Sequence, residues 1–222
     1  MIIPIVGPIL VMGYALICFQ SWREQREPYP EFDFTYFGDY LRAGAWPFLV
    51  TFVWGLILVP IIWLLIAIIF VPVVAISGET GEKGILIIGV GVGIAVVSVI
   101  QLLFMAFLTP AIIKSGLEQN FSSGFHFEFI KDFLKRVGWE TLATGIVLFF
   151  SSLIAAVLGW VALCLGIFFA MAWQAFFTWH MHFQLYEKYL ERGGRPVHVS
   201  PDLSFGHLQP QDSNPPQIPP GA

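Results

Sequence analysis

The sequence predicts an all-α membrane protein with about five transmembrane helices in two parallel repeats, each an amphipathic interfacial helix before a two-helix hairpin. Composition is the first indication: apolar residues make up 57% of the chain and charged residues only 12%, about half the charged fraction of a soluble domain. The charges are also segregated, because none lies within residues 1–20, 47–78, 84–113 or 141–186. Each segment is long enough for a span, which needs about 20 apolar residues.

The repeat rests on two similar stretches, FDFTYFGDYLRAGAW and FHFEFIKDFLKRVGW. Both fit the pattern F-x-F-x-[YF]-x-x-D-[YF]-L-[RK]-x-x-x-W. In the second copy, apolar residues from Ile130 to Val137 recur at helical spacing, and charged residues take the other face. Short aromatic helices of this kind lie in the membrane interface, a depth that Trp also favours. The motif residues are Phe32, Phe34, Asp39, Leu41, Arg42 and Trp46, and then Phe125, Phe127, Asp132, Leu134, Lys135 and Trp139.

Residues 1–22 form the first predicted span, which its Pro and Gly residues make irregular. A polar link containing two prolines then leads to the first repeat, residues 32–113. Its opening F-x-F-x-Y alternation predicts an extended segment, and helical spacing starts at Phe37. The two spans of this repeat flank the polar turn SGETGEKG, and we expect Pro60 and Pro72 to kink the first span or end it early.

The second repeat covers residues 125–188 and contains two spans joined by a minimal turn at Gly159. The transmembrane domain is therefore predicted to comprise residues 1–188. Residues 189–222 are rich in Pro, Gln, Ser and Gly, which predicts a polar tail that is disordered or bound to a partner. The GVGVG run at 89–93 lies within an apolar span, so we interpret its glycines as helix-packing positions and not as a phosphate loop.

Lys and Arg fall almost entirely on one side of the predicted spans. Only Lys83 lies in the opposite set of loops, and the basic side of a membrane protein is normally cytoplasmic. We therefore expect the N-terminus outside, the C-terminus in the cytoplasm, and both interfacial helices on the cytoplasmic leaflet. The basic residues on that side are Arg23, Arg26, Arg42, Lys114, Lys131, Lys135, Arg136, Lys188, Arg192 and Arg195.

The spans offer little for catalysis or metal binding. Intramembrane charges usually mark ion paths and proton relays, and the charge-free segments hold none. Cys18 and Cys164 are interpreted as small apolar packing residues. His180 and His182 point about 200° apart on a helix, too far to share one metal. We therefore predict no catalytic, metal or cofactor-binding residue and no enzymatic activity, and the net charge of −4 indicates no nucleic-acid partner.

The run MGYALICFQSWREQREPYPEFDFTYFGDYLRAG resembles the bacterial membrane-protein family catalogued as domain of unknown function 4013. The resemblance implies a polytopic protein of the bacterial inner membrane, and it brings no activity, cofactor or catalytic residue. The matching positions are Met12-Gly13-Tyr14, the segment Pro30-Glu31-Phe32-Asp33, Phe37-Gly38 and Gly44.

The function that these observations favour is that of a non-catalytic integral membrane protein. We expect an accessory or scaffold subunit of a larger membrane complex, or a shaper of the cytoplasmic leaflet. Its partners would be the lipid bilayer and other membrane proteins or a second copy. The alternative is a permeation or transport protein for a neutral or apolar solute, since transporters are often built from repeats. An enzyme acting on lipids would have to use Asp39, His126 or Asp132.

Overall fold

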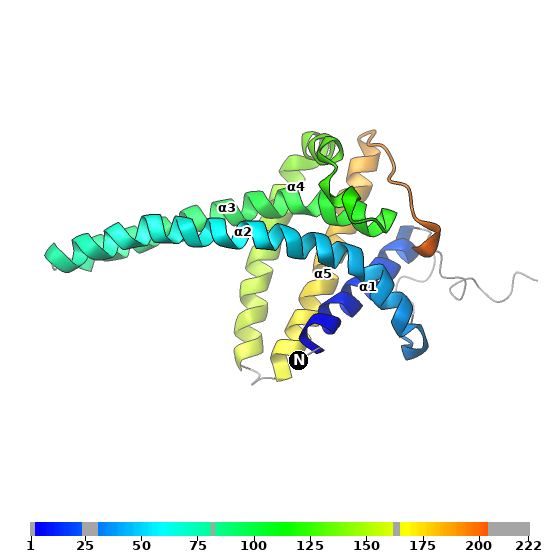
Figure 1. The fold of residues 1–222 in the computed structure, drawn as a ribbon, viewed down its shortest axis with the longest axis horizontal. Coiled ribbons are helices and arrows are strands. Elements are labelled where there is room, and N and C mark those ends of the chain that lie inside the picture. The colour runs from blue at the N-terminus through cyan, green and yellow to red at the C-terminus, as the bar shows by residue number, and fades with distance from the viewer. Residues whose placement is uncertain (1–2, 24–30, 81–82, 162–164, 204–222) are drawn as a thin grey trace, which may run out of the picture.

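The computed structural model describes residues 3–23, 31–80, 83–161 and 165–203, and its main elements are five helices. Short 3₁₀ turns lie in the connections between them (Figure 1). The all-helical class predicted from the sequence is confirmed for these residues. The helices are α1 (Ile3–Arg23), α2 (Phe37–Thr80), α3 (Lys83–Glu118), α4 (Phe127–Val161) and α5 (Leu165–Glu191).

Three of the described helices are long and apolar enough to cross a membrane. The qualifying segments are Phe34–Ser77, Ile87–Glu118 and Phe127–Trp160. The 44 residues of α2 extend about 66 Å at 1.5 Å per residue. That is about twice the thickness of a bilayer's hydrocarbon core, so α2 has length for a span and for a further segment outside it.

The helices form two hairpins that meet at one packed end of the molecule, which we call the base. Helix α2 packs along α3, α4 packs along α5, and α1 contacts both α2 and α5. The two hairpins leave the base in different directions (Figure 1). Within the first hairpin, Gly89 and Gly93 of α3 lie directly against Val73 and Phe70 of α2. The packing role expected for the GVGVG run is confirmed at these two positions, whereas Gly91 faces open space.

The prolines of α2 do not end it, because the helix continues through Pro47, Pro60 and Pro72. A proline has no amide hydrogen, so the carbonyl four residues earlier loses its helical donor. At Pro47 that carbonyl belongs to Ala43, and the side-chain amide of Gln119 donates to its oxygen at 3.1 Å. A side chain from the end of α3 thus replaces the missing hydrogen bond, which is how neighbouring helices make proline tolerable in a membrane helix.

The turn predicted at Gly159 lies elsewhere, because Gly159 is inside α4, which runs to Val161. A single glycine costs a helix only about 1 kcal/mol relative to alanine. The neighbouring apolar residues therefore carry the helix past it. The connection to α5 falls at residues 162–164, outside the described residues.

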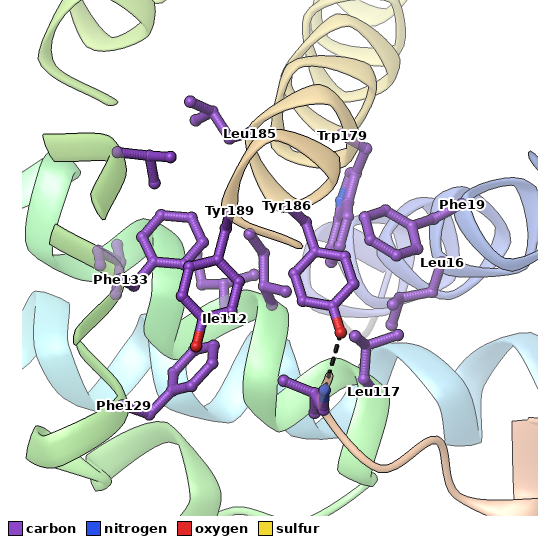
Figure 2. Packing of buried hydrophobic residues seen from close by; sticks show 14 of the residues in the cluster. Leu16, Phe19, Ile112, Leu117, Phe129, Phe133, Trp179, Leu185, Tyr186 and Tyr189 are labelled. Carbon is purple, nitrogen blue, oxygen red and sulfur yellow. Dashed lines mark hydrogen bonds between the residues drawn. The ribbon is translucent and has the colours of Figure 1, made fainter. Parts of the chain in front are cut away.

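The core lies at the base, where all five helices meet, and aromatic rings dominate it (Figure 2). Tyr186 and Tyr189 of α5 stand at its centre. The ring of Tyr189 stacks on Phe133 of α4 with 5.0 Å between centroids, and the ring of Tyr186 lies 5.9 Å from Phe19 of α1. This packing joins the first, fourth and fifth helices into one body.

The outer ends of the hairpins differ from the base in burial, because their large apolar side chains are exposed whereas those of the base are buried. Trp63 of α2 is 67% exposed, Ile87 of α3 is 71% exposed and Trp160 of α4 is 82% exposed. Apolar surface this extensive is not stable in water. Together with the length of the helices, it identifies the chain as a helical membrane protein.

The segment after α5 folds back onto the base. Gly193 has a positive φ of 75°, which turns the chain. The backbone N–H of Val197 then donates to the Tyr186 hydroxyl at 2.8 Å, and the N–H of Ser200 donates to the Leu117 carbonyl at 2.9 Å. Residues 192–203, which composition assigned to a polar tail, are held by contacts that composition does not reveal. Residues 204–222 lie outside the described residues.

Candidate functional site at the base of the hairpins

The first motif copy begins with a turn and not with the extended segment expected from its alternation. Only the residues up to Asp33 are extended. The Asp33 carboxylate accepts a hydrogen bond from the Thr35 N–H at 2.8 Å, which starts the 3₁₀ turn Phe34–Tyr36. Asp side chains commonly bond to the backbone two residues on, and this local bond overrides the alternating pattern. The ring of Phe32 stacks on Tyr40 with 5.0 Å between centroids.

The remaining motif residues of this copy lie on a helix that runs directly into the hairpin. Because Gln119 repairs the interruption at Pro47, α2 continues unbroken past Trp46. The first copy is therefore not a separate interfacial helix. Phe34, Asp39 and Arg42 are exposed, while Leu41 and Trp46 are half-buried.

The second copy is separated from its hairpin by a kink. Val137 has non-helical dihedral angles, φ −129° and ψ 22°, inside α4. The Thr141 hydroxyl donates to the Val137 carbonyl at 2.7 Å, so the kink keeps a hydrogen bond. Trp139, 79% exposed, lies two residues after this kink.

The apolar face predicted for the second copy is confirmed. Ile130, Phe133 and Val137 are almost fully buried in the base. The other motif residues surround this face: Phe125, Asp132 and Leu134 are half-buried, and Phe127 and Lys135 are exposed. The two copies thus share a pattern, but the second is packed into the base more deeply.

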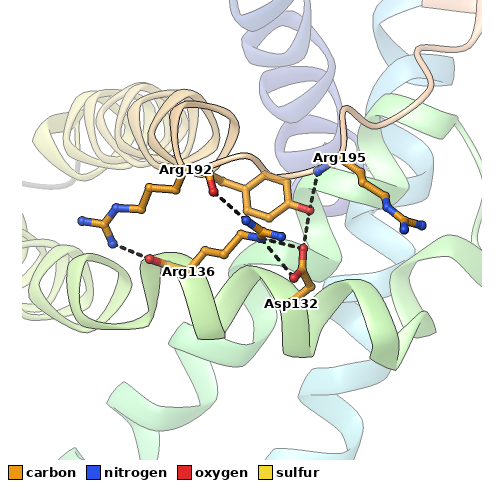
Figure 3. A network of polar contacts seen from close by, with 5 residues as sticks. Asp132, Arg136, Arg192 and Arg195 are labelled. Carbon is orange, nitrogen blue, oxygen red and sulfur yellow. Dashed lines mark hydrogen bonds and ion pairs between the residues drawn. The ribbon is translucent and has the colours of Figure 1, made fainter.

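A polar clamp of Asp132, Arg136, Glu140, Tyr189 and Arg192 joins the second motif to the end of α5. Figure 3 shows Asp132, Arg136 and Arg192 of this clamp. Asp132 accepts hydrogen bonds from Arg136 Nε, with 3.0 Å to each carboxylate oxygen, and from the Tyr189 hydroxyl at 3.0 Å. Arg192 pairs with Glu140 and donates to the Arg136 carbonyl. The ion pair that the spacing of Asp132 and Arg136 favours is therefore present, in a wider network.

The clamp shifts the pKa values of Asp132 and Tyr189. The hydrogen bonds from Arg136, followed by the one from Tyr189, hold the pKa of Asp132 below its ordinary value. Burial, together with the hydrogen bond to Asp132, raises the pKa of Tyr189 to about 12. Tyr189 therefore stays protonated and donates to the Asp132 carboxylate at neutral pH. Sequence reasoning missed Tyr189, because nothing local links it to a residue 57 positions earlier.

Helices α1 and α2 cross in backbone contact next to the first motif. Gly13 and Gly44 face each other, and a Cβ on Gly44 would overlap the Ile9 carbonyl oxygen. Small residues allow this close approach in membrane proteins. Tyr14 then packs edge-on against Phe32, with 5.5 Å between centroids. Residues from both ends of the stretch that carries the family resemblance therefore meet at one place.

A cavity of about 380 Å³ lies between the two hairpins, beside the base. It is bounded mainly by α3, α4 and α5, and its uncharged polar lining includes Thr109, Thr144, Gln174 and His182. His182 reaches α3, where its Nε2 lies 3.4 Å from the Thr109 hydroxyl oxygen. His180 points elsewhere, against the ring of Trp22. The separate directions expected for the two histidines are confirmed.

These features define a helical membrane protein with a packed base, two apolar hairpins and, between them, a mainly apolar cavity with several polar groups. The chain belongs to the family described as protein of unknown function (DUF4013), whose sequence profile matches residues 1–176. The family indicated by the Gly13–Gly44 stretch is thus confirmed, and the match extends well beyond that stretch. No curated protein and no solved structure is significantly similar to the chain.

Proposed function

We propose that this protein is a non-catalytic scaffold of the bacterial inner membrane, whose hairpins contact lipid and other membrane proteins or a second copy. The observation that carries the proposal is the contrast between the packed base and the bare apolar ends of the hairpins. Trp63 and Ile87 mark this surface on the first hairpin, and Trp160 and Phe169 mark it on the second. A body of this kind presents many large apolar side chains to its neighbours.

The positions of the basic residues support a cytoplasmic base. Arg136 and Arg192 lie in the clamp, and Lys131 and Lys135 are exposed beside it. Lys83 opens α3 at the far tip of the first hairpin (Figure 1). Exposed lysines at the base are suited to anionic lipid headgroups of the cytoplasmic leaflet.

The proposed topology has five spans in two parallel repeats, with the N-terminus outside and the C-terminus in the cytoplasm. Each motif leads into a helical hairpin that starts from the base, which supports a common starting point for the two repeats. The start of α1 lies near the far end of the α4–α5 hairpin (Figure 1). An N-terminus outside the membrane agrees with that position.

The roles of the carboxylates at the base support a structural and not a catalytic assignment. Asp132 is occupied by Arg136 and Tyr189, and Glu140 is paired with Arg192. Glu118 is paired with Lys114 at 3.4 Å. A general base needs a carboxylate that faces a substrate site, whereas Asp132 and Glu140 join α4 to Tyr189 and Arg192, and Glu118 is paired within α3.

The cavity between the hairpins favours a second candidate function, the permeation of a neutral or apolar solute. Its walls come from both repeats, as in transporters that bind substrate at the interface of two repeats. Flux of a neutral solute into proteoliposomes, compared with empty liposomes, tests this candidate. Equal flux in both removes it.

The scaffold role is tested by crosslinking in native membranes. A photoreactive residue is placed at Leu64, which is 61% exposed on the first hairpin, and for comparison at Lys135 at the base. Tagged protein is then extracted in lipid nanodiscs, and the adducts are identified by mass spectrometry. The proposal expects a stoichiometric protein adduct from Leu64, to a partner or a second copy. Adducts to lipid alone would contradict it.

A further inference from the structure

The cavity between the hairpins has a wall in which five of the six threonine and serine hydroxyls already donate to the backbone. A hydroxyl has only one hydrogen to donate and keeps lone pairs that accept. Five threonine and serine hydroxyls of the wall each donate to the backbone carbonyl four residues earlier. These bonds are Thr51 to Pro47, Thr109 to Met105, Thr141 to Val137, Ser152 to Leu148 and Thr178 to Gln174, at 2.7–2.9 Å.

The hydrogen bond of Thr109 also determines which ring nitrogen of His182 carries the hydrogen. Because the Thr109 hydrogen is committed to Met105, the contact between Thr109 and His182 requires Nε2–H of His182 to donate. In the neutral ring Nδ1 is then an acceptor. That nitrogen is buried and has no hydrogen-bond partner among the described residues, in a side chain of a residue only 5% exposed. Because this atom has almost no accessible surface, the polar group that His182 contributes beside the cavity is Nε2–H, which donates to the Thr109 hydroxyl.

We propose that this cavity binds a neutral, mainly apolar molecule whose polar end carries a hydroxyl group. The wall supplies acceptors from the hydroxyl groups of Thr109, Thr141 and Ser152, so it fits a ligand that donates. The described residues of the wall include no Asp, Glu, Lys or Arg, so none of them balances a charged headgroup. Leucine, methionine, isoleucine and phenylalanine side chains complete the wall and suit an alkyl chain.

The volume sets the size of the ligand. A cavity of about 150 Å³ holds benzene, with six carbon atoms, so about 380 Å³ has room for roughly fifteen non-hydrogen atoms. A linear alcohol such as 1-dodecanol, with thirteen, fits. The site requires only that the protein lies in a bilayer, and it stands apart from the scaffold role, so either proposal can fail alone.

The test uses a matched pair of probes on the full chain in nanodiscs. A dodecanol analogue with a diazirine labels the protein under light, and mass spectrometry locates the adducts. The competitors are 1-dodecanol and 1-methoxyundecane, which has the same number of non-hydrogen atoms but donates no hydrogen bond. Labelling of residues 52–76, on the exposed hairpin, reports the probe concentration in the lipid. Labelling of residues 141–153 and 174–182 reports the cavity.

We expect 1-dodecanol to displace the cavity label about fivefold better than 1-methoxyundecane, as for the loss of one buried hydrogen bond. Neither competitor should change the ratio of labels along the exposed hairpin. Equal competition by the two compounds would show that only an alkyl chain binds and would overturn the proposal. Cavity labelling no stronger than hairpin labelling would overturn it too.

Two variants locate the site. His182→Phe and Thr109→Val remove polar groups of the wall while keeping the side chains similar in size. His180→Phe is the matched control, because His180 lies on the same helix but contacts Trp22 and Gln184 instead. The advantage of the alcohol should fall in Thr109→Val, which removes an acceptor of the wall, and persist in the control. An advantage that persists in Thr109→Val, which preserves shape, would refute the assignment even if His182→Phe does not fold.

Discussion

The crossing of α1 and α2 offers a sharp test of the packing described for the base. In Gly44→Ala the new Cβ would overlap the Ile9 carbonyl oxygen and lie 2.7 Å from the Gly13 nitrogen. Ordinary van der Waals contacts begin at 3.4 Å, so the helices must separate by roughly 0.7 Å for the nitrogen alone. The overlap with the oxygen requires more.

The magnitude follows from two opposing terms. Replacing a helical glycine with alanine stabilises a helix by about 1 kcal/mol. Overpacking a tight contact costs about 1–3 kcal/mol, and backbone atoms cannot move aside as a side chain can. We therefore expect Gly44→Ala to lower the free energy of unfolding by up to about 2 kcal/mol. Gly55→Ala is the matched control on the same helix, because a Cβ there meets nothing within 4 Å.

The assay is reversible unfolding in mixed micelles at increasing mole fractions of sodium dodecyl sulfate, followed by tryptophan fluorescence. Gly55→Ala should leave the free energy of unfolding unchanged or raise it by up to about 1 kcal/mol. The two substitutions should therefore have opposite or clearly different effects. A Gly44→Ala protein as stable as Gly55→Ala would refute the backbone contact between α1 and α2.

Three further predictions concern the base. Gln119→Leu should lower the free energy of unfolding by about 1–3 kcal/mol, since the Ala43 carbonyl loses its replacement donor; Gln184→Leu, at an exposed site, should have little effect in the same assay. The stability that Asp132 contributes is complete above its ordinary pKa of 3.8 and is lost as pH falls through the lowered pKa. In Asp132→Asn the free energy of unfolding should therefore depend less on pH in this acid range. Tyr186→Phe should speed hydrogen exchange at the Val197 amide, whose acceptor is the Tyr186 hydroxyl.

Local sequence patterns were sufficient for the helices and for one buried face. Long charge-free segments predicted the membrane helices, because a span is a local requirement on length and polarity. The spacing from Ile130 to Val137 predicted the buried face of the second motif, because helical periodicity is also local. The second copy of the repeated motif lies in the base, so the repeat indicated where part of the core forms.

The contacts that define the candidate sites depend on residues far apart in the chain. Gln119 serves a carbonyl 76 positions earlier, and His182 meets a hydroxyl 73 positions earlier. Neither partner carries a local signal, since a glutamine after a helix and a histidine in an aromatic stretch have many roles. The proline at position 47 was the one available clue, because a proline inside a helix always leaves a carbonyl to be satisfied.

The measurement that tests the membrane account most directly is the sidedness of single cysteines in intact cells. Lys83→Cys lies at the tip of the first hairpin, and Lys135→Cys lies exposed at the base; the unmodified chain gives the background from the native cysteines. A membrane-impermeant maleimide should label Lys83→Cys from outside and Lys135→Cys only after permeabilisation. Labelling of both cysteines from the same side would contradict a hairpin that crosses the membrane from a cytoplasmic base.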